Sequence, residues 1–486
     1  MKPPLACVKC RIRKKKCDRA YPACSYCLKT HERCEYRVSG VSNKLPARAA
    51  PLVQTLDRNR RSRTTGFDGV FLGYPFFPSY FAGDDNSNVI ISNDLRTFVI
   101  NDRNLGKNIT DFLEETNFFC MPFIPRQDLH AQLSNESSQL NSSEILLLAC
   151  IKVLCLPVEG DACAQSNPPY LAIKTAFVSA EVNSVLNVRL LQALVVLLIY
   201  EYCHGIYPSA YITLGTCTRY LAALGINRPS LPSEEPIDWV DTETRRRLWW
   251  AIYTMERIIM LGYPKGNLLL GEPDQNEPLP SDDISWEQAY PSAEAHLTLL
   301  APATSEMSSF RHVVHAAYLI GRVLQHASDN HLPVQVYSER GKQLNRTISA
   351  LMSALEVETR SAVFLVTVPR AILNSAIFLL HSISVHSNDE ITAEHLELTR
   401  SSSAKIYSDR VRLFLQGNLE SEYKPSPFLL HWAFHVFQYF HAMYRREGHS
   451  EILQVLQDLE KSFEILDRRW NLAGVYMTLL NTMQGK

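Results

Sequence analysis

Residues 7–34 read CVKCRIRKKKCDRAYPACSYCLKTHERC and contain six of the twelve cysteines of the chain. The spacing Cys-x2-Cys-x6-Cys occurs twice, with six residues between the copies, so the segment is a repeat. In each copy the Cys-x2-Cys turn lets two thiolates converge on one ion, and the third cysteine returns after a short helix. Three thiolates per copy cannot make two separate four-ligand zinc sites, but two ions that share two sulfurs satisfy the count.

A dense run of positive charge lies between the second and third cysteines. It consists of Arg11, Arg13, Lys14, Lys15 and Lys16. Six thiolates carry more negative charge than two zinc ions neutralise, so neighbouring cations offset the excess and favour the thiolate form. Lys and Arg also contact phosphates, and a short helix can bring them onto guanine N7 and O6. A nuclear-localisation signal is compatible with that role, and a passive solvated face is the alternative.

Two other uses of clustered cysteines lack their context in this sequence. A disulfide framework needs an oxidising compartment, but the opening residues MKPP lead straight to cysteines without a cleavable signal. A thioredoxin-like redox pair needs a surrounding βαβ pattern. The most apolar run, residues 190–200, is too short to span a bilayer and contains Gln192. We therefore expect reduced thiols in an intracellular protein with no membrane segment.

The cysteine segment resembles the fungal binuclear zinc-cluster (Zn2Cys6) transcription factors. The resemblance rests on the six cysteines, the residues RIRKKK before Cys17, Pro22 ahead of Cys24, and the run Cys27-Leu28-Lys29. It implies two Zn²⁺ ions per chain and a loop shaped by Pro22. It further implies that Cys7 and Cys24 bridge the ions, with one ion completed by Cys10 and Cys17 and the other by Cys27 and Cys34.

The same resemblance implies that the partner is double-stranded DNA. A helix from Val8 to about Lys15 would enter the major groove, with Arg13 and Lys14 at the base edges of a CGG-type triplet. Phosphate contacts would come from Lys9, Arg11, Lys15, Lys16 and Lys29. Such a protein works in the nucleus and contacts the transcription machinery or co-regulators.

The formal net charge of −1 hides an uneven distribution along the chain. Residues 1–65 hold seventeen Lys/Arg against four Asp/Glu, whereas the rest of the chain holds 32 against 46. We therefore predict three parts: a Zn2Cys6 DNA-binding module (1–37), a basic flexible linker (38–66) and an all-α regulatory domain (67–486). The linker carries a second basic patch that either contacts phosphates or serves as a solvated tether: Arg58, Arg60, Arg61 and Arg63.

Apolar residues recur at helical spacing through the body. Residues 210–229, AYITLGTCTRYLAALGINRP, predict a helix with Gly225 just past its end, and residues 241–262, DTETRRRLWWAIYTMERIIMLG, predict another. In the second, Asp241 is the predicted N-cap, and Glu243 pairs with Arg247. Further helices are predicted at 309–328, 341–356, 361–386, 395–416, 427–445 and 450–483.

These two stretches also resemble the fungal-specific transcription factor domain, the middle homology region found behind such zinc clusters. The matching residues are Leu214-Gly215, Leu224-Gly225-Ile226, Arg228, the run from Arg245 to Arg257, and Leu279-Pro280. The chain departs from the family at Gly262-Tyr263-Pro264, where members more often show a small residue and Gly-Arg-Pro. The resemblance implies a regulatory role for the body.

Signals for catalysis are weak. The run HWAFH at 431–435 places two histidines one helical turn apart but lacks the glutamate of a metalloprotease helix, so packing is the better interpretation. His312, His315 and the Trp249-Trp250 pair are interpreted in the same way. We therefore predict a sequence-specific DNA-binding transcription regulator that is not an enzyme. The alternatives are a ligand or partner sensor whose zinc module is a protein-interaction surface and, more remotely, a metal-dependent enzyme.

The linker offers only a short leucine heptad, at Leu45, Leu52 and Leu56. Pro46 and Pro51 would both lie inside that helix, where each removes a backbone donor. We therefore predict no dimerising coiled coil in residues 1–65. A homodimer through the all-α domain remains compatible with the sequence, and a flexible linker would then leave the half-site spacing loosely specified.

Overall fold

The computed structural model describes residues 6–20, 23–30 and 34, and residues 89–484 apart from gaps at 102–103, 108, 112–120, 135–139, 157–163, 227–238, 290–296, 305–306, 330, 359–366, 385–389 and 418–425. The chain divides into two compact units, Met1–Phe67 and Asp68–Lys486. The predicted linker, 38–66, lies outside the described residues.

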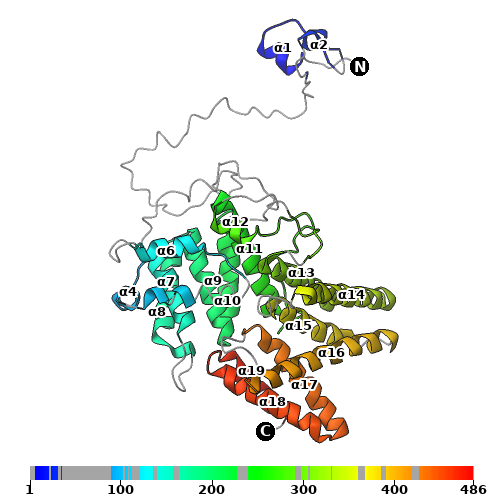
Figure 1. Cartoon of the computed structure of the whole chain (residues 1–486). Coiled ribbons are helices and arrows are strands. Elements are labelled where there is room, and N and C mark those ends of the chain that lie inside the picture. The colour runs from blue at the N-terminus through cyan, green and yellow to red at the C-terminus, as the bar shows by residue number, and fades with distance from the viewer. Residues whose placement is uncertain are drawn as a thin grey trace. The chain divides into compact units, whose positions relative to one another are not determined.

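The N-terminal unit has two short helices, α1 (Val8–Ile12) and α2 (Ser25–Lys29), one in each copy of the cysteine repeat (Figure 1). Both helices begin directly after the first cysteine of their copy. The buried residues that pack together here are cysteines: Cys7, Cys10, Cys24 and Cys27. Because so small a cluster of side chains buries little apolar surface, we expect the module to need metal to fold.

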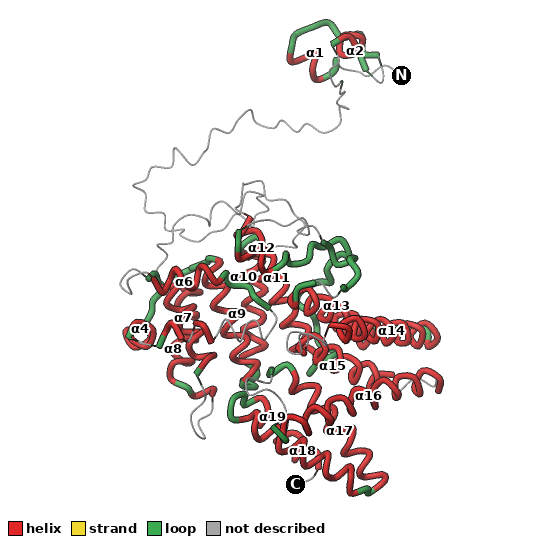
Figure 2. Tube along the Cα trace, in the orientation of Figure 1, coloured by secondary structure: helices red, strands yellow, loops and turns green. Residues whose placement is uncertain are grey.

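The regular structure of the body's described residues is helical, with loops between the helices, and the one extended pairing among them is an isolated bridge between Pro278 and Thr298 (Figure 2). The prediction of a metal-folded module followed by an all-α body is confirmed. The helices are α4 (Asn93–Ile100), α6 (Arg126–Ser134), α7 (Ser142–Cys155), α8 (Pro168–Val182), α9 (Val188–Cys203), α10 (Ser209–Ala223), α11 (Trp239–Met260), α12 (Asp283–Glu287), α13 (Ser309–Ser328), α14 (Val334–Glu358), α15 (Thr367–Ser384), α16 (Glu390–Leu415), α17 (Leu429–Glu447), α18 (Ser450–Asp467) and α19 (Leu472–Gln484), with a 3₁₀ turn at Ala164–Ser166.

Helix α9 is the centre of the first half of the body. Every residue from Leu190 to Cys203 is buried, so the helix is enclosed on all sides. It packs on α7, α10 and α11. Helix α11 packs on α13, and α13 packs on α15. Helix α15 packs on both α16 and α17, and α18 and α19 lie at the C-terminal end (Figure 1). One continuous apolar core therefore runs through both halves of the body.

Several helix boundaries follow the sequence, and others do not. The helices predicted to begin at 341 and 395 begin earlier, as α14 at Val334 and α16 at Glu390. Helix α13 spans the predicted 309–328, and Gly225 lies just past α10 with φ +65°. The prediction of Asp241 as an N-cap is wrong, because α11 begins at Trp239 and the Asp241 carboxylate accepts from Arg245 Nε at 2.7 Å. The single helix predicted at 450–483 is two helices.

Side-chain hydrogen bonding explains the break between α18 and α19. Asp467 Oδ1 accepts the N–H of Gly474 at 2.9 Å, so the last residue of α18 satisfies a backbone donor in the first turn of α19. Trp470 is buried in the turn between the two helices. Helical periodicity does not indicate such a cap, because the capping residue lies seven positions before the residue whose N–H it accepts.

Candidate metal centre and nucleic-acid interface

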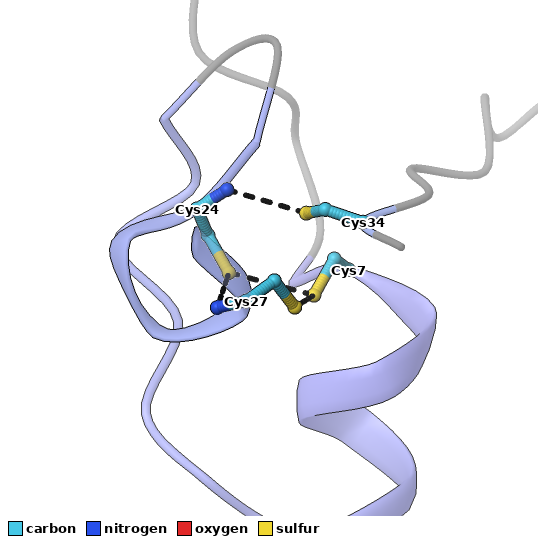
Figure 3. Close-up of side chains that lie close together, drawn as sticks. All are labelled: Cys7, Cys24, Cys27 and Cys34. Carbon is cyan, nitrogen blue, oxygen red and sulfur yellow. Dashed lines mark hydrogen bonds between the residues drawn. The ribbon is translucent and has the colours of Figure 1, made fainter. Parts of the chain in front are cut away.

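The six cysteine sulfurs form two overlapping groups of four. Within each group all sulfur atoms lie within 4.8 Å of one another, and the groups are Cys7, Cys10, Cys17 and Cys24, and Cys7, Cys24, Cys27 and Cys34. Figure 3 shows the second group, whose members come from both copies of the repeat. Cys7 and Cys24 belong to both groups, which is the arrangement that two ions need if they share two thiolates.

Sulfur separations provide a test of the fit to zinc. Sulfurs at about 2.3 Å from a tetrahedral zinc lie about 3.8 Å apart. The Sγ atoms of Cys7 and Cys24 are 3.8 Å apart, and Cys7–Cys27 and Cys10–Cys24 are each 3.7 Å apart. The donor set and its spacing therefore fit a thiolate zinc cluster.

The two copies of the repeat have the same local structure. Cys7 Sγ accepts the N–H of Cys10 at 3.4 Å, and Cys24 Sγ accepts the N–H of Cys27 at 3.5 Å. In each copy the first cysteine is thus the N-cap of a helix, where backbone N–H groups and the helix dipole favour a negative sulfur. The sequence repeat is therefore also a structural repeat.

The thiols differ in how readily they ionise without metal. Burial, reinforced by neighbouring sulfurs, raises the pKa of Cys10 and raises that of Cys27 to about 12. Burial also opposes ionisation of Cys24, but hydrogen bonds from Cys27 and the other thiols outweigh it and lower the pKa of Cys24. A metal that binds this set must displace protons, so its affinity rises with pH.

Helix α1 is shorter than predicted. It ends at Ile12, not near Lys15, because Lys14 adopts the left-handed conformation with φ +52°. The N–H of Lys14 bonds to Arg11 O at 3.2 Å and that of Lys15 to Cys10 O at 2.9 Å, which is a Schellman motif. Glycine is the usual residue at this position, and lysine here costs about 1 kcal/mol.

The predicted DNA-contacting cations are on this module, on both helices and the turn after α1. Arg11, Arg13, Lys14, Lys15, Lys16 and Lys29 are exposed, and Lys9 is half-buried. Five of them lie between Cys10 and Cys17, so a metal centre that holds these two cysteines would fix both ends of the segment that carries the cations. The arrangement presents a compact positive surface on a metal-folded support.

Sequence reasoning missed one contact of the module, between Asp18 and Ser25. The Asp18 carboxylate accepts the N–H of Ser25 at 3.1 Å and the Ser25 hydroxyl also donates to it. These hydrogen bonds lower the pKa of Asp18. The signal was present in the sequence, because each residue directly follows a cysteine of the predicted cluster and Ser25 opens a helix.

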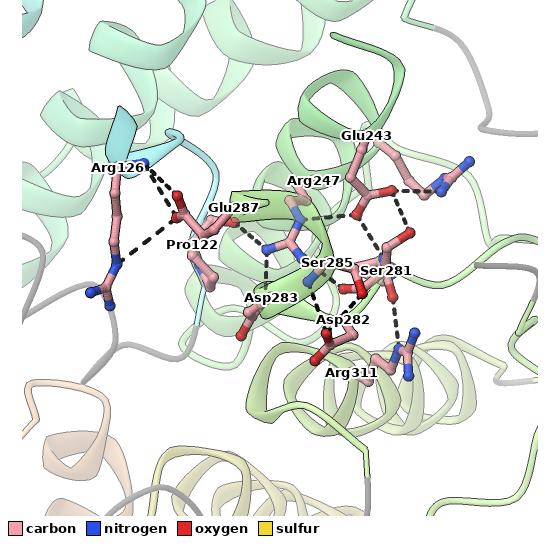
Figure 4. Close-up of polar contacts among 12 residues, drawn as sticks. Pro122, Arg126, Glu243, Arg247, Ser281, Asp282, Asp283, Ser285, Glu287 and Arg311 are labelled. Atoms are coloured by element: carbon pink, nitrogen blue, oxygen red, sulfur yellow. Dashed lines mark hydrogen bonds and ion pairs between the residues drawn. The ribbon is translucent and has the colours of Figure 1, made fainter. Parts of the chain in front are cut away.

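In the body, the predicted pair of Glu243 and Arg247 is confirmed and belongs to a larger network (Figure 4). Both side chains are fully buried, with 2.9 Å between Arg247 Nε and Glu243 Oε1. Arg247 also donates to Ser281 O and Asp283 Oδ1, each at 2.7 Å, and its guanidinium lies 4.0 Å from the ring centre of Trp286. Glu243 accepts the N–H of Ser281 at 2.7 Å. These contacts hold residues 281–286 against α11.

A second buried network lies near the C-terminal end of α11. Glu256 accepts the N–H of Leu270 at 3.2 Å, and Arg257 donates to Glu272 Oε1 at 3.1 Å. Burial raises the pKa of Glu256 although Arg257 is adjacent. Gly321 of α13 faces this network, and a Cβ there would lie 2.9 Å from the Tyr253 hydroxyl. A larger residue at this position would therefore force the side chains of the network to shift.

The tryptophan pair of α11 and the two histidines of the HWAFH run take part in packing. Trp249 and Trp250 are buried edge to face with ring centres 4.7 Å apart. Burial lowers the pKa of His431 well below its usual value and lowers that of His435 to about 4, so both rings are neutral near pH 7. Among the described helices, none is long and apolar enough to cross a membrane.

A six-cysteine metal module followed by an all-α body is the organisation of zinc-cluster transcription regulators. Residues 5–40 match the fungal Zn(2)-Cys(6) binuclear cluster domain, and residues 109–361 match the fungal specific transcription factor domain. The chain belongs to this family of fungal transcription factors. Its module binds two zinc ions, and it is a transcription regulator.

Several named proteins are similar to parts of the chain. Transcription factor BOA15 of Botryotinia fuckeliana (strain B05.10) is 34% identical over 131 residues, 26% of this chain and 72% of that protein. The pigment biosynthesis transcriptional activator pigB of Monascus ruber is 27% identical over 147 residues, 28% of this chain and 26% of its own length. The citrinin biosynthesis transcriptional activator ctnR of Monascus purpureus is 24% identical over 162 residues, 32% of this chain and 28% of its own length.

Proposed function

We propose that the chain is a nuclear, sequence-specific DNA-binding regulator, not an enzyme, and that its zinc module binds CGG-type triplets in the major groove. The observation that carries this proposal is the exposed run of cations at the end of α1 and on the turn that follows it, between the metal ligands Cys10 and Cys17. A surface fixed by metal at both ends can present cations to DNA at little cost in chain entropy.

The residues have separate roles in this proposal. Cys7 and Cys24 bridge the two zinc ions, Cys10 and Cys17 complete one, and Cys27 and Cys34 complete the other. Arg13 and Lys14 contact base edges, where guanine offers two acceptors to a cation. The phosphate contacts, which position the module without selecting sequence, come from Lys9, Arg11, Lys15, Lys16 and Lys29.

The all-α body is the regulatory part, and it contacts co-regulators or the transcription machinery. Pairing of two chains through this body would allow recognition of paired triplets. Because two similar proteins are named as activators of pigment and citrinin biosynthesis, genes of a biosynthetic pathway are the first targets to examine. Genomic occupancy in the source organism, combined with transcript levels in a deletion strain, tests that assignment.

Binding measurements on the zinc-loaded chain test the base contacts. Arg13→Ala and Lys14→Ala should each weaken binding to the preferred duplex by about 1–3 kcal/mol and relax base preference. Lys29→Ala is the matched control, because loss of a phosphate contact weakens all duplexes about equally and lowers the salt slope by about one. If Lys14→Ala weakens preferred and random DNA by the same factor, Lys14 is a phosphate contact and the assignment is wrong.

A selection from random duplexes tests the proposal as a whole. The chain should enrich a common triplet and protect it in footprinting. Failure to enrich any sequence at moderate salt would favour the alternative, in which the zinc module binds another protein.

A further inference from the structure

The two halves of the zinc module differ in one respect. Residues 1–17 contain no Asp or Glu, so the first copy of the repeat has no carboxylate ahead of its helix or within it. The second copy is preceded by Asp18, the residue that directly follows the ligand Cys17. Its carboxylate reaches Ser25, the residue that directly follows the ligand Cys24. One side-chain contact therefore joins the neighbours of two metal ligands.

The contact between Asp18 and Ser25 joins the two ends of the segment that connects the copies, so this segment forms a closed loop. Both Asp18 oxygens lie near the N–H of Ser25, at 3.1 and 3.2 Å, and the Ser25 hydroxyl donates to Oδ2. Ser25 is the first residue of α2, where a backbone N–H has no partner within the helix. The Cys24 sulfur accepts a second of these amides, from Cys27. Asp18 and Cys24 together thus cap α2.

We propose that Asp18 is a positioning residue for the zinc cluster: its hydrogen bonds to Ser25 hold Cys24 and the start of α2 in place for metal binding. Cys24 belongs to both groups of four sulfurs, so a displacement of this one residue would disturb both metal positions. A connection that is already closed loses less chain entropy when the metal binds. The role concerns retention of zinc and does not depend on whether the module binds DNA.

The rate at which the zinc-loaded full-length chain loses metal to an excess of a chromogenic chelator, under reducing conditions and without DNA, tests this role. Asp18→Ala should release zinc roughly three- to tenfold faster, the size expected when a helix loses a capping side chain. Asp18→Asn should stay within about twofold of the original chain, because its amide oxygen can still accept the Ser25 N–H. Glu32→Ala is the control, since it removes one carboxylate from the same module.

Two further variants separate a specific contact from a general effect. Ser25→Ala keeps the backbone donor and should release zinc only slightly faster than the original chain. Combined with Asp18→Ala it should add nothing, because both changes break the same contact. Cobalt(II) substituted into Asp18→Ala should give the absorption bands of four-sulfur tetrahedral coordination, since Asp18 is not a ligand.

Each outcome of these measurements supports or overturns the proposal. Equal acceleration by Asp18→Ala and Glu32→Ala would show an effect of charge alone, as would equal acceleration by Asp18→Ala and Asp18→Asn. Release at the original rate from Asp18→Ala would show that the contact has no role. If Asp18→Ala retains no zinc while Glu32→Ala retains two ions, the positioning role is supported.

Discussion

The zinc module and the helical body achieve order by different means. The module buries cysteines whose sulfurs form two overlapping groups of four, and its described helices are five residues long. The body buries a continuous apolar core, and its buried charges occur in networks such as that of Glu243 and Arg247. Because metal supplies order in one unit and packing in the other, the two should fail under different conditions.

Removal of zinc should have the largest effect and should be confined to one unit. Structural zinc contributes about 10–16 kcal/mol to small metal-folded modules, so chelation under reducing conditions should unfold the module. The body should keep its circular dichroism and melting temperature. Elemental analysis should give two zinc ions per chain before treatment. A body that melts together with the module would show that the two units are not independent.

Breaking the buried pair in α11 should destabilise the body by up to about 3–5 kcal/mol. Arg247→Met leaves the fully buried Glu243 with Arg246 as its remaining cation, and Glu243→Gln leaves Arg247 with Asp283 as its remaining carboxylate. Denaturant unfolding followed by tryptophan fluorescence measures the loss. Arg245→Met is the control, because Arg245 pairs with Asp241 at a partly exposed site. Equal effects from Arg245→Met and Arg247→Met would contradict the importance of burial.

A methyl group at Gly321 should cost about 1–3 kcal/mol. A Cβ there would lie 2.9 Å from Glu272 Oε1 and 3.0 Å from Arg257 Nε, within a packed network. Gly215→Ala is a matched substitution in the interior of α10, where the nearest atom would lie at 3.9 Å. Since alanine is the better helix former, Gly215→Ala should leave stability unchanged or raise it by up to about 1 kcal/mol. Thermal unfolding of both variants separates the two cases.

The smallest predicted effects come from two helix ends of the same geometry, one in each unit. Lys14 and Gly225 both have positive φ, at +52° and +65°. Lys14→Gly should stabilise the zinc-loaded module by about 1 kcal/mol while weakening DNA binding, and Gly225→Ala should destabilise the body by about 1 kcal/mol. Zinc competition and thermal unfolding provide the two measurements. A less stable module in Lys14→Gly would show that the lysine side chain itself supports the fold.

The sequence determined more about the module's ligands than about its backbone. Cysteine spacing indicated the sulfur donors, because metal geometry limits how far apart ligands can lie. It could not indicate the early end of α1, since Lys14 carries none of the signals of a residue with positive φ. In the body, periodicity indicated most of the helices from α10 onward because it reports burial on one face. It did not indicate α9, which is buried on all sides and so has no polar face. It missed the break after Asp467, where one side chain decides the boundary.

The short distances between the cysteine sulfurs of the module have a consequence for its oxidation. The Cys7 sulfur lies less than 4 Å from the sulfurs of both Cys24 and Cys27, and bound zinc would engage the sulfur lone pairs that react with an oxidant. Once the metal has left, six neighbouring thiols can join in many different pairings, most of which prevent its return. Loss of zinc in air should therefore become irreversible with time, visible by intact mass as the loss of two hydrogens for each new disulfide. Storage with a reductant should keep the thiols reduced, so that zinc can bind again.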